Sequence, residues 1–89
     1  MSDYIEARNS PATKAYVTGL GEGLDFASHQ AESLHGAPLF CAPPRLKLTT
    51  QNFIDIIEAE RIVNPGKSSG PWPLVGVLLR GLVRTFPCK

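Results

Sequence analysis

The sequence is poor in the residue types that build catalytic and metal centres. Its 89 residues include two cysteines, two histidines and one tryptophan. Cys-x-x-Cys spacing is absent, and neither cysteine has histidines nearby at ligand spacing, so we expect no metal site. An excess of one charge is also missing, because nine Lys and Arg stand against eight Asp and Glu for a formal net charge of +1. This balance argues against a face that binds nucleic acid.

Long hydrophobic runs are missing as well. The longest, from Leu74 to Leu79, contains Gly76 and is far shorter than the roughly 18 apolar residues of a membrane-spanning helix. At the start of the chain, no basic segment is followed by an apolar stretch, so no secretory signal is visible. We therefore expect no insertion into a membrane.

Cys41 and Cys88 bracket the second half of the chain, and their separation suits a structural disulfide better than a metal site. The length allows one domain, 1–89, with a small core that benefits from a staple. In the chain-entropy picture, closing a loop of this length contributes about 4 kcal/mol. Disulfides persist in oxidising compartments, so the pair predicts a periplasmic or extracellular protein. We reconcile this with the missing signal by expecting that a signal peptide has been removed ahead of Met1.

The first main helix is expected to begin at Ser10-Pro11, since serine can cap a helix and proline is tolerated at its first position. Apolar side chains then recur at helical spacing, at Tyr16, Leu20, Leu24 and Ala27. Three glycines interrupt this segment, each at a cost of about 1 kcal/mol relative to alanine: Gly19, Gly21 and Gly23. We expect close packing of a neighbouring helix against Gly19 or Gly23 to compensate.

A second helix is expected from Gln51 to about Val63, with Thr49 or Thr50 as its cap and Asn64-Pro65-Gly66 as its end. Residues 35–48 before it, which contain Cys41, are expected to be irregular. The apolar side chains of this helix should face the core: Phe53, Ile54, Ile57 and Ile62. Its charged side chains should point outward: Asp55, Glu58, Glu60 and Arg61.

A third helix is expected to start near Pro71-Trp72-Pro73. It is apolar over most of its circumference, with Leu74, Val75, Leu78, Leu79, Leu82, Val83 and Phe86. Gly76 and Gly81 would let neighbouring helices approach, and Arg80 and Arg84, four residues apart, are expected on one solvated face. Together these segments predict an all-α fold, a small bundle of three to four helices stapled by one disulfide.

Catalytic chemistry has few candidate groups. Cys41 lies near His35 in sequence and an imidazole can activate a thiolate, but Cys88 offers Cys41 a disulfide partner, which favours a structural role. The cluster Gly19–Gly23 has no preceding strand, so a phosphate-binding loop is not expected. Trp72 reads either as a lid over the core or as an anchor for a partner. We expect no enzymatic activity and no cofactor.

Several short motifs follow one another along the chain. They are Phe40-Cys41-Ala42-Pro43, a Thr-Thr-Gln helix start, a helix that ends in Asn-Pro, and an apolar helix that closes in Phe-Pro-Cys. Upstream lies Ala15-Tyr16-Val17-Thr18-Gly19. In order and spacing these motifs resemble the Rap1a/Tai family, the small periplasmic immunity proteins of bacterial type VI secretion systems. The resemblance covers residues 12–88.

The resemblance implies a protein that protects its producer by occlusion. Family members bind amidase effectors that cleave peptidoglycan peptides and block the active-site cleft, often as a homodimer. It therefore implies a periplasmic chain whose partner is a cognate peptidoglycan amidase. The positions that carry over are mostly structural: Tyr16, Gly19, Cys41, Gln51, Phe86, Pro87 and Cys88.

The binding surface does not follow from the family's motifs. An inhibitor needs an exposed element that is already held rigidly, because ordering a loop on binding costs affinity. The segment from Asn64 to Trp72 joins two helices of the disulfide-closed unit, so we expect it to contact the effector. The candidate contact residues are Asn64, Lys67, Ser68, Ser69 and Trp72.

Two other functions fit a small helical chain of this kind. One is a periplasmic chaperone or stress protein that holds unfolded clients on exposed apolar surface. The other is a structural subunit of an envelope or prophage assembly. Gene neighbourhood would separate these alternatives, since an immunity gene should lie beside its toxin.

Overall fold

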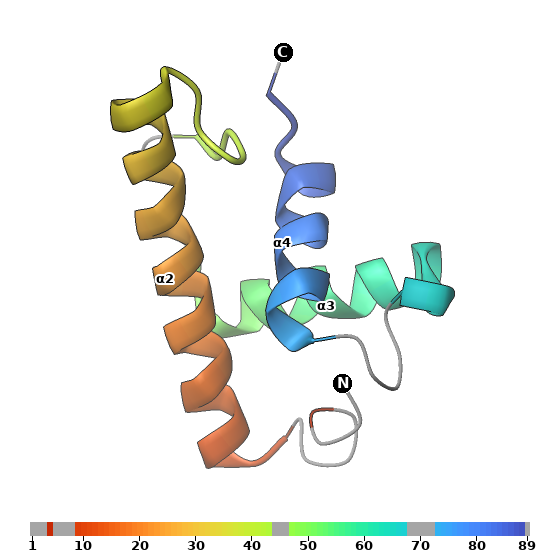
Figure 1. Ribbon diagram of the computed structural model, residues 1–89. Coiled ribbons are helices and arrows are strands. Elements are labelled where there is room, and N and C mark those ends of the chain that lie inside the picture. The colour runs from red at the N-terminus through yellow and green to blue at the C-terminus, as the bar shows by residue number, and fades with distance from the viewer. Residues whose placement is uncertain (1–3, 5–8, 44–46, 68–72, 89) are drawn as a thin grey trace.

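The described part of the chain is built from helices. The computed structural model describes Tyr4 and residues 9–43, 47–67 and 73–88. In these residues helix α2 (Pro11–His35), helix α3 (Thr50–Val63), the 3-10 turn η1 (Pro65–Lys67) and helix α4 (Leu74–Thr85) follow one another. Figure 1 shows α2 along one side of the molecule, α4 beside it, and α3 crossing behind α4. The described residues contain no strand, which confirms the prediction of a small all-α bundle.

Local capping chemistry defines both ends of α2. The Ser10 side chain accepts a hydrogen bond from the backbone N–H of Thr13 at 3.1 Å, and Pro11 occupies the first turn. At the other end Gly36 adopts a left-handed conformation with φ of 82°, and its N–H donates to the Glu32 carbonyl at 2.9 Å. Glycine reaches this conformation at little cost, so the helix ends where the sequence supplies a glycine.

No described helix has the length and hydropathy of a membrane span.

The buried face of α2 differs from the predicted one by about one residue. Val17, Gly21, Leu24 and Ser28 are buried, whereas Tyr16 is 58% exposed. The glycine that permits close packing is Gly21, because a Cβ there would overlap the ring of Phe53 on α3. Gly19 and Gly23 have open space around their Cβ positions, so the expectation that one of them packs against a helix is wrong.

The two kinds of glycine should respond in opposite ways to alanine. Gly21→Ala is expected to destabilise the fold by about 1–3 kcal/mol, because the added methyl group overlaps Phe53 and overpacking costs more than the gain in helix propensity. Gly23→Ala, in open space on the same helix, should stabilise it by about 0.5–1 kcal/mol. Urea unfolding measures both changes. Equal effects at the two positions would contradict the packing described for Gly21.

Helix α3 begins with a capping box and packs a narrow face into the core. Thr49 accepts the N–H of Asn52 at 3.2 Å, and the Asn52 side chain accepts the N–H of Thr49 at 2.9 Å. The buried residues follow the spacing of one helix face: Phe53, Ile56, Ile57 and Glu60. Two predictions are therefore wrong, since Glu60 does not point outward and Ile62, two residues further along, is 82% exposed.

Helix α4 supplies the centre of the core. Its buried side chains are Leu74, Val77, Leu78 and Leu82. A Cβ on Gly81 would come within 2.5 Å of the Ile56 side chain, so Gly81 permits the close approach of α3 that was expected of it. Gly76 has open space instead. Val75 and Val83 are about two-fifths exposed, so the helix is less completely enclosed than its composition predicted.

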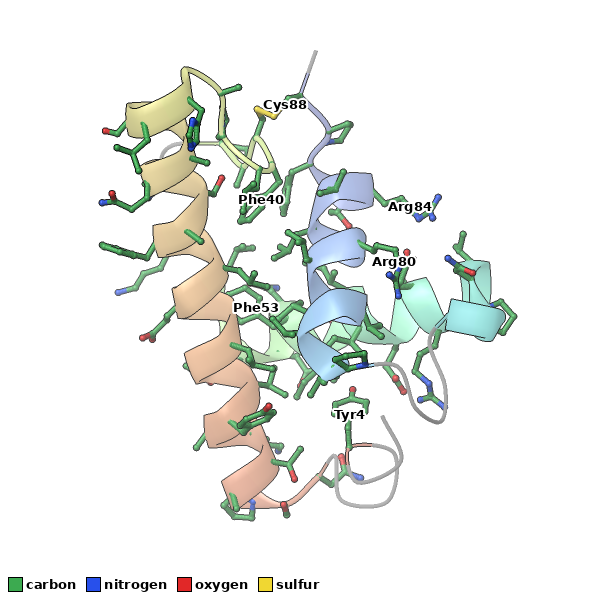
Figure 2. The ribbon with its side chains drawn as sticks, in the orientation of Figure 1. Tyr4, Phe40, Phe53, Arg80, Arg84 and Cys88 are labelled. Carbon is green, nitrogen blue, oxygen red and sulfur yellow. A yellow bond between two sulfur atoms is a disulfide. The ribbon has the colours of Figure 1, made fainter. Side chains whose placement is uncertain are left out.

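The disulfide closes the fold at the end where α4 stops. Cys41 is bonded to Cys88, with their Cα atoms 5.1 Å apart, which confirms the predicted pairing. The backbone N–H of Cys41 also donates to the carbonyl of Phe86 at 2.8 Å. Next to the bridge, Phe40 is buried in the core. Figure 2 shows Phe40 between α2 and α4, close to the disulfide. The bridge therefore holds both the segment after α2 and the end of the chain on the core.

Candidate partner-binding site

The disulfide argues against Cys41 as a catalytic nucleophile, a possibility that the sequence raised. Cys41 is bonded to Cys88, so the thiolate required for a cysteine-based mechanism is not present in this state. His35 is the last residue of α2 and is exposed. Among the described residues, no group of three His, Cys, Asp or Glu side chains is placed to hold a metal ion.

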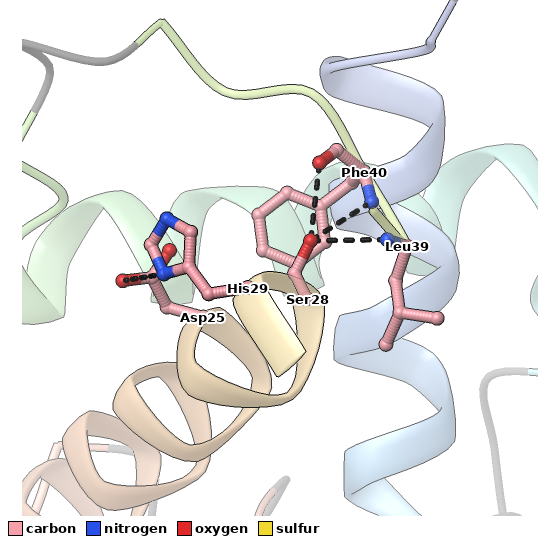
Figure 3. Close-up of polar contacts among 5 residues, drawn as sticks. All are labelled: Asp25, Ser28, His29, Leu39 and Phe40. Atoms are coloured by element: carbon pink, nitrogen blue, oxygen red, sulfur yellow. Dashed lines mark hydrogen bonds and ion pairs between the residues drawn. The ribbon is translucent and has the colours of Figure 1, made fainter. Parts of the chain in front are cut away.

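A serine, a histidine and a carboxylate lie close together on α2 but point in different directions (Figure 3). The buried Ser28 hydroxyl accepts hydrogen bonds from the N–H groups of Leu39 (3.0 Å) and Phe40 (3.3 Å) and donates to the Phe40 carbonyl (3.2 Å). The exposed His29 ring instead lies 3.9 Å from Asp25. Ser28 therefore anchors the segment that follows α2, and it does not face the imidazole.

The end of α3 carries the most exposed large apolar side chain of the described residues. Ile62 is 82% exposed and Val63 is 56% exposed. Pro65 and Gly66, in the turn η1 that follows, are exposed too. We call Ile62, Val63, Pro65 and Gly66 the apolar tip. In Figure 1 it lies on the far side of α4 from α2 and projects from the body of the molecule.

The apolar tip overlaps the predicted contact segment. Asn64 is half-buried and ends α3, with its N–H donating to the Glu60 carbonyl at 2.8 Å. Lys67 is the last residue of η1. The other predicted contact residues, Ser68, Ser69 and Trp72, lie outside the described residues. Sequence reasoning missed Ile62 and Val63. Ile62 lies nine residues after Phe53 and so on the opposite side of α3, which could have placed it outside the core. Val63 lies seven residues after the buried Ile56, so its exposure does not follow from helical spacing.

A buried carboxylate lies at the base of the apolar tip. The Glu60 side chain is 0% exposed, and its Oε1 accepts a hydrogen bond from the Nε of Arg84 at 2.8 Å. Its Oε2 lies 3.8 Å from the Nε of Arg80. Arg80 and Arg84 lie on one face of α4, as predicted. Their side chains contact Glu60 and are also partly exposed to solvent. The hydrogen bond to Glu60 and its negative charge raise the pKa of Arg84 above the ordinary value, so the guanidinium stays charged.

A second apolar surface runs along the exposed side of α2. Three large side chains there are well exposed: Tyr16 (58%), Phe26 (65%) and Leu34 (71%). Gly19, Gly23 and Gln30 share this side of the helix and are also exposed. None of these residues is charged. We call the six residues the outer face of α2.

The residues named by the sequence motifs fall in two groups. Tyr16 and Gly19 belong to the outer face of α2, so they are surface residues and not core residues. Gln51 is exposed and donates a hydrogen bond to Asp55 at 2.8 Å. By contrast, Phe86 is half-buried against the core, next to the exposed Pro87. Tyr16, Gly19 and Gln51 therefore lie on the surface, whereas Cys41, Cys88 and Phe86 hold the end of α4 on the core.

Comparison with known proteins does not assign this chain to a family. We compared the chain with protein-family models, with curated proteins and with solved structures. None of the three comparisons gives a significant match.

Proposed function

We propose that this chain is a periplasmic immunity protein that binds a peptidoglycan amidase effector of a type VI secretion system and occludes its active-site cleft. The observation that carries the proposal is the apolar tip, where Ile62 and Val63 are exposed on a projecting helix end. These two side chains are adjacent in sequence and both well exposed, and exposed apolar clusters mark interaction surfaces. The order of motifs around Cys41 and Cys88 supplies the choice of family.

The geometry suits insertion into a cleft. The tip continues a regular helix whose last turn is closed by the hydrogen bond from Asn64 to Glu60. Its base is joined to α4 by the Glu60–Arg84 pair, and the far end of α4 is tied down by the disulfide. Because the tip is ordered before binding, little conformational entropy is lost when it docks.

Growth rescue tests the function directly. The amidase that the proposal expects to be encoded beside this gene is exported to the periplasm of a test bacterium, with and without this chain in the same compartment. Rescue from lysis by the wild-type chain is expected. Lysis at the same rate in both cultures would refute the immunity role. A chaperone, the main alternative, should instead suppress aggregation of an unrelated unfolded protein, and we expect no such suppression.

We propose further that the protein forms a homodimer through the outer face of α2. The face carries no charge, so a second copy meets no buried unpaired ion, and isologous contacts suit a two-fold dimer. At 1.5 Å per residue the outer face from Tyr16 to Leu34 is about 27 Å long and about 10 Å wide. This footprint is about a third of the ~800 Å² per partner of a standard interface, so a weak, concentration-dependent dimer is expected.

A charge on the outer face should disrupt this dimer. Phe26→Glu is expected to weaken self-association by about tenfold or more, because it desolvates a carboxylate at the centre of the contact. Val75→Glu, which alters a partly exposed apolar residue of α4, is the matched control and should associate as the wild type does. Sedimentation equilibrium over a range of concentrations measures both. Identical association in all three proteins would exclude this face.

A further inference from the structure

Glu60 connects the base of the apolar tip to α4. Its buried carboxylate accepts a hydrogen bond from Arg84 at 2.8 Å and lies 3.8 Å from the Nε of Arg80. Its backbone carbonyl accepts the N–H of Asn64, the residue that follows α3, at 2.8 Å. One residue is therefore bonded through its side chain to α4 and through its main chain to the start of the tip.

The carboxylate lies where α3 and α4 approach closely. A Cβ on Gly81 would come within 3.2 Å of the Ile56 carbonyl oxygen and 3.6 Å of the Glu60 Cβ. Arg80 and Arg84 flank Gly81 on α4, and Figure 2 shows both side chains on the side of α4 that faces the end of α3. Close backbone packing and two charged partners together leave the Glu60 carboxylate little freedom to shift along α4.

Stability alone does not explain a carboxylate at this position. Desolvation of the charge opposes burial, and apolar replacement of a buried ion pair is often neutral or stabilising. An apolar side chain would, however, tolerate small rotations of α3 against α4. The carboxylate has to meet the guanidinium of Arg84, and hydrogen-bond geometry is directional. The pair therefore selects one orientation of the last turn of α3.

We infer that Glu60 is a positioning residue that sets the direction in which the apolar tip projects. The inference rests on the proposed function for its biological meaning, because the tip is the surface offered to the amidase. A tip held in one direction binds without the entropy loss of an ordering step. Glu60 itself is buried and makes no contact with the partner in this scheme.

Hydrogen–deuterium exchange of the Glu60→Met variant tests the inference. Methionine matches the length of glutamate but lacks the charge. Amides of residues 61–67, apart from Pro65, which has no N–H, are expected to exchange about tenfold or more faster relative to the amides of α2 and α4 than in the wild type. The melting temperature should fall as well, because Arg80 and Arg84 lose their buried partner. Asp55→Asn changes an exposed carboxylate of the same helix and should exchange as the wild type does. Glu60→Gln, which keeps the shape and loses the charge, should show the same local change to a smaller extent.

Two results would overturn the positioning role. One is wild-type exchange at residues 61–67 in both Glu60 variants. The other is an equal increase in exchange throughout α2 and α4, since Glu60 would then stabilise the whole fold and not the tip in particular. Neither readout involves the amidase. A wild-type chain that fails to bind the amidase would therefore refute the proposed function and leave the positioning role standing.

Discussion

Removal of the disulfide by Cys41→Ser and Cys88→Ser together is expected to lower the free energy of unfolding by about 4 kcal/mol. The bridge closes a loop with a sequence separation of 47 residues, which includes all of α3 and α4. Without it, the unfolded chain gains the conformational freedom of that loop. For a domain of this size, such a loss corresponds to a fall of about 15–30 °C in melting temperature.

Thermal unfolding followed by circular dichroism measures this change. The wild-type protein in reducing agent is the matched control, since it keeps both cysteines and loses only the bond, and it should unfold with the double variant. The segment next to Cys41 should also become more mobile. The Cys41 N–H donates a hydrogen bond to the Phe86 carbonyl, and this bond joins the same two parts of the chain as the disulfide. A decrease of less than about 1 kcal/mol in the free energy of unfolding would mean that the hydrophobic core is stable without the disulfide, contrary to the expectation for so short a chain.

If the proposed function is correct, introducing a negative charge at the apolar tip should abolish most of the affinity for the proposed amidase partner. Ile62→Asp and Val63→Asp should each weaken binding by about 100-fold or more, because a carboxylate would be desolvated without a partner at the centre of the contact. Both side chains are exposed, so the fold should be unaffected. Isothermal titration of each variant into the amidase measures the loss, and circular dichroism verifies the fold.

The control for this experiment is Val83→Asp. Val83 is partly exposed on α4, so it offers the same kind of substitution away from the tip. It should bind the amidase as tightly as the wild type does. Equal losses in all three variants would point to a general effect of charge, and unchanged binding by the two tip variants would place the interface elsewhere.

The helix ends could be predicted because short-range chemistry determines them. Ser10 and Thr49 cap their helices through hydrogen bonds to residues three positions away. Asn64 and the proline after it end α3 as expected. The pairing of Cys41 with Cys88 was equally accessible, since the chain offers no other cysteine. These features need no knowledge of how the helices pack.

The buried faces depend on residues far apart in sequence and were predicted less well. Tyr16 and Val17 define two adjacent stripes on α2, and the contact of Gly21 with Phe53 selects the second. Glu60 carries a charge, so sequence reasoning placed it outside, but its partner Arg84 lies 24 residues further along the chain. The partner-binding role of the segment after α3 stays a prediction. Ile62 was assigned to the core, in a position that Glu60 in fact occupies.

Inhibition of the proposed amidase partner by the purified wild-type chain is the most direct measurement of the proposed function. Hydrolysis of a peptidoglycan peptide is followed while the chain is titrated into the enzyme. We predict that activity falls to zero near one molar equivalent of protomer or of dimer, with a nanomolar dissociation constant. Full hydrolysis at a tenfold or greater molar excess of folded, disulfide-bonded protein would contradict the proposal that this chain blocks the active site.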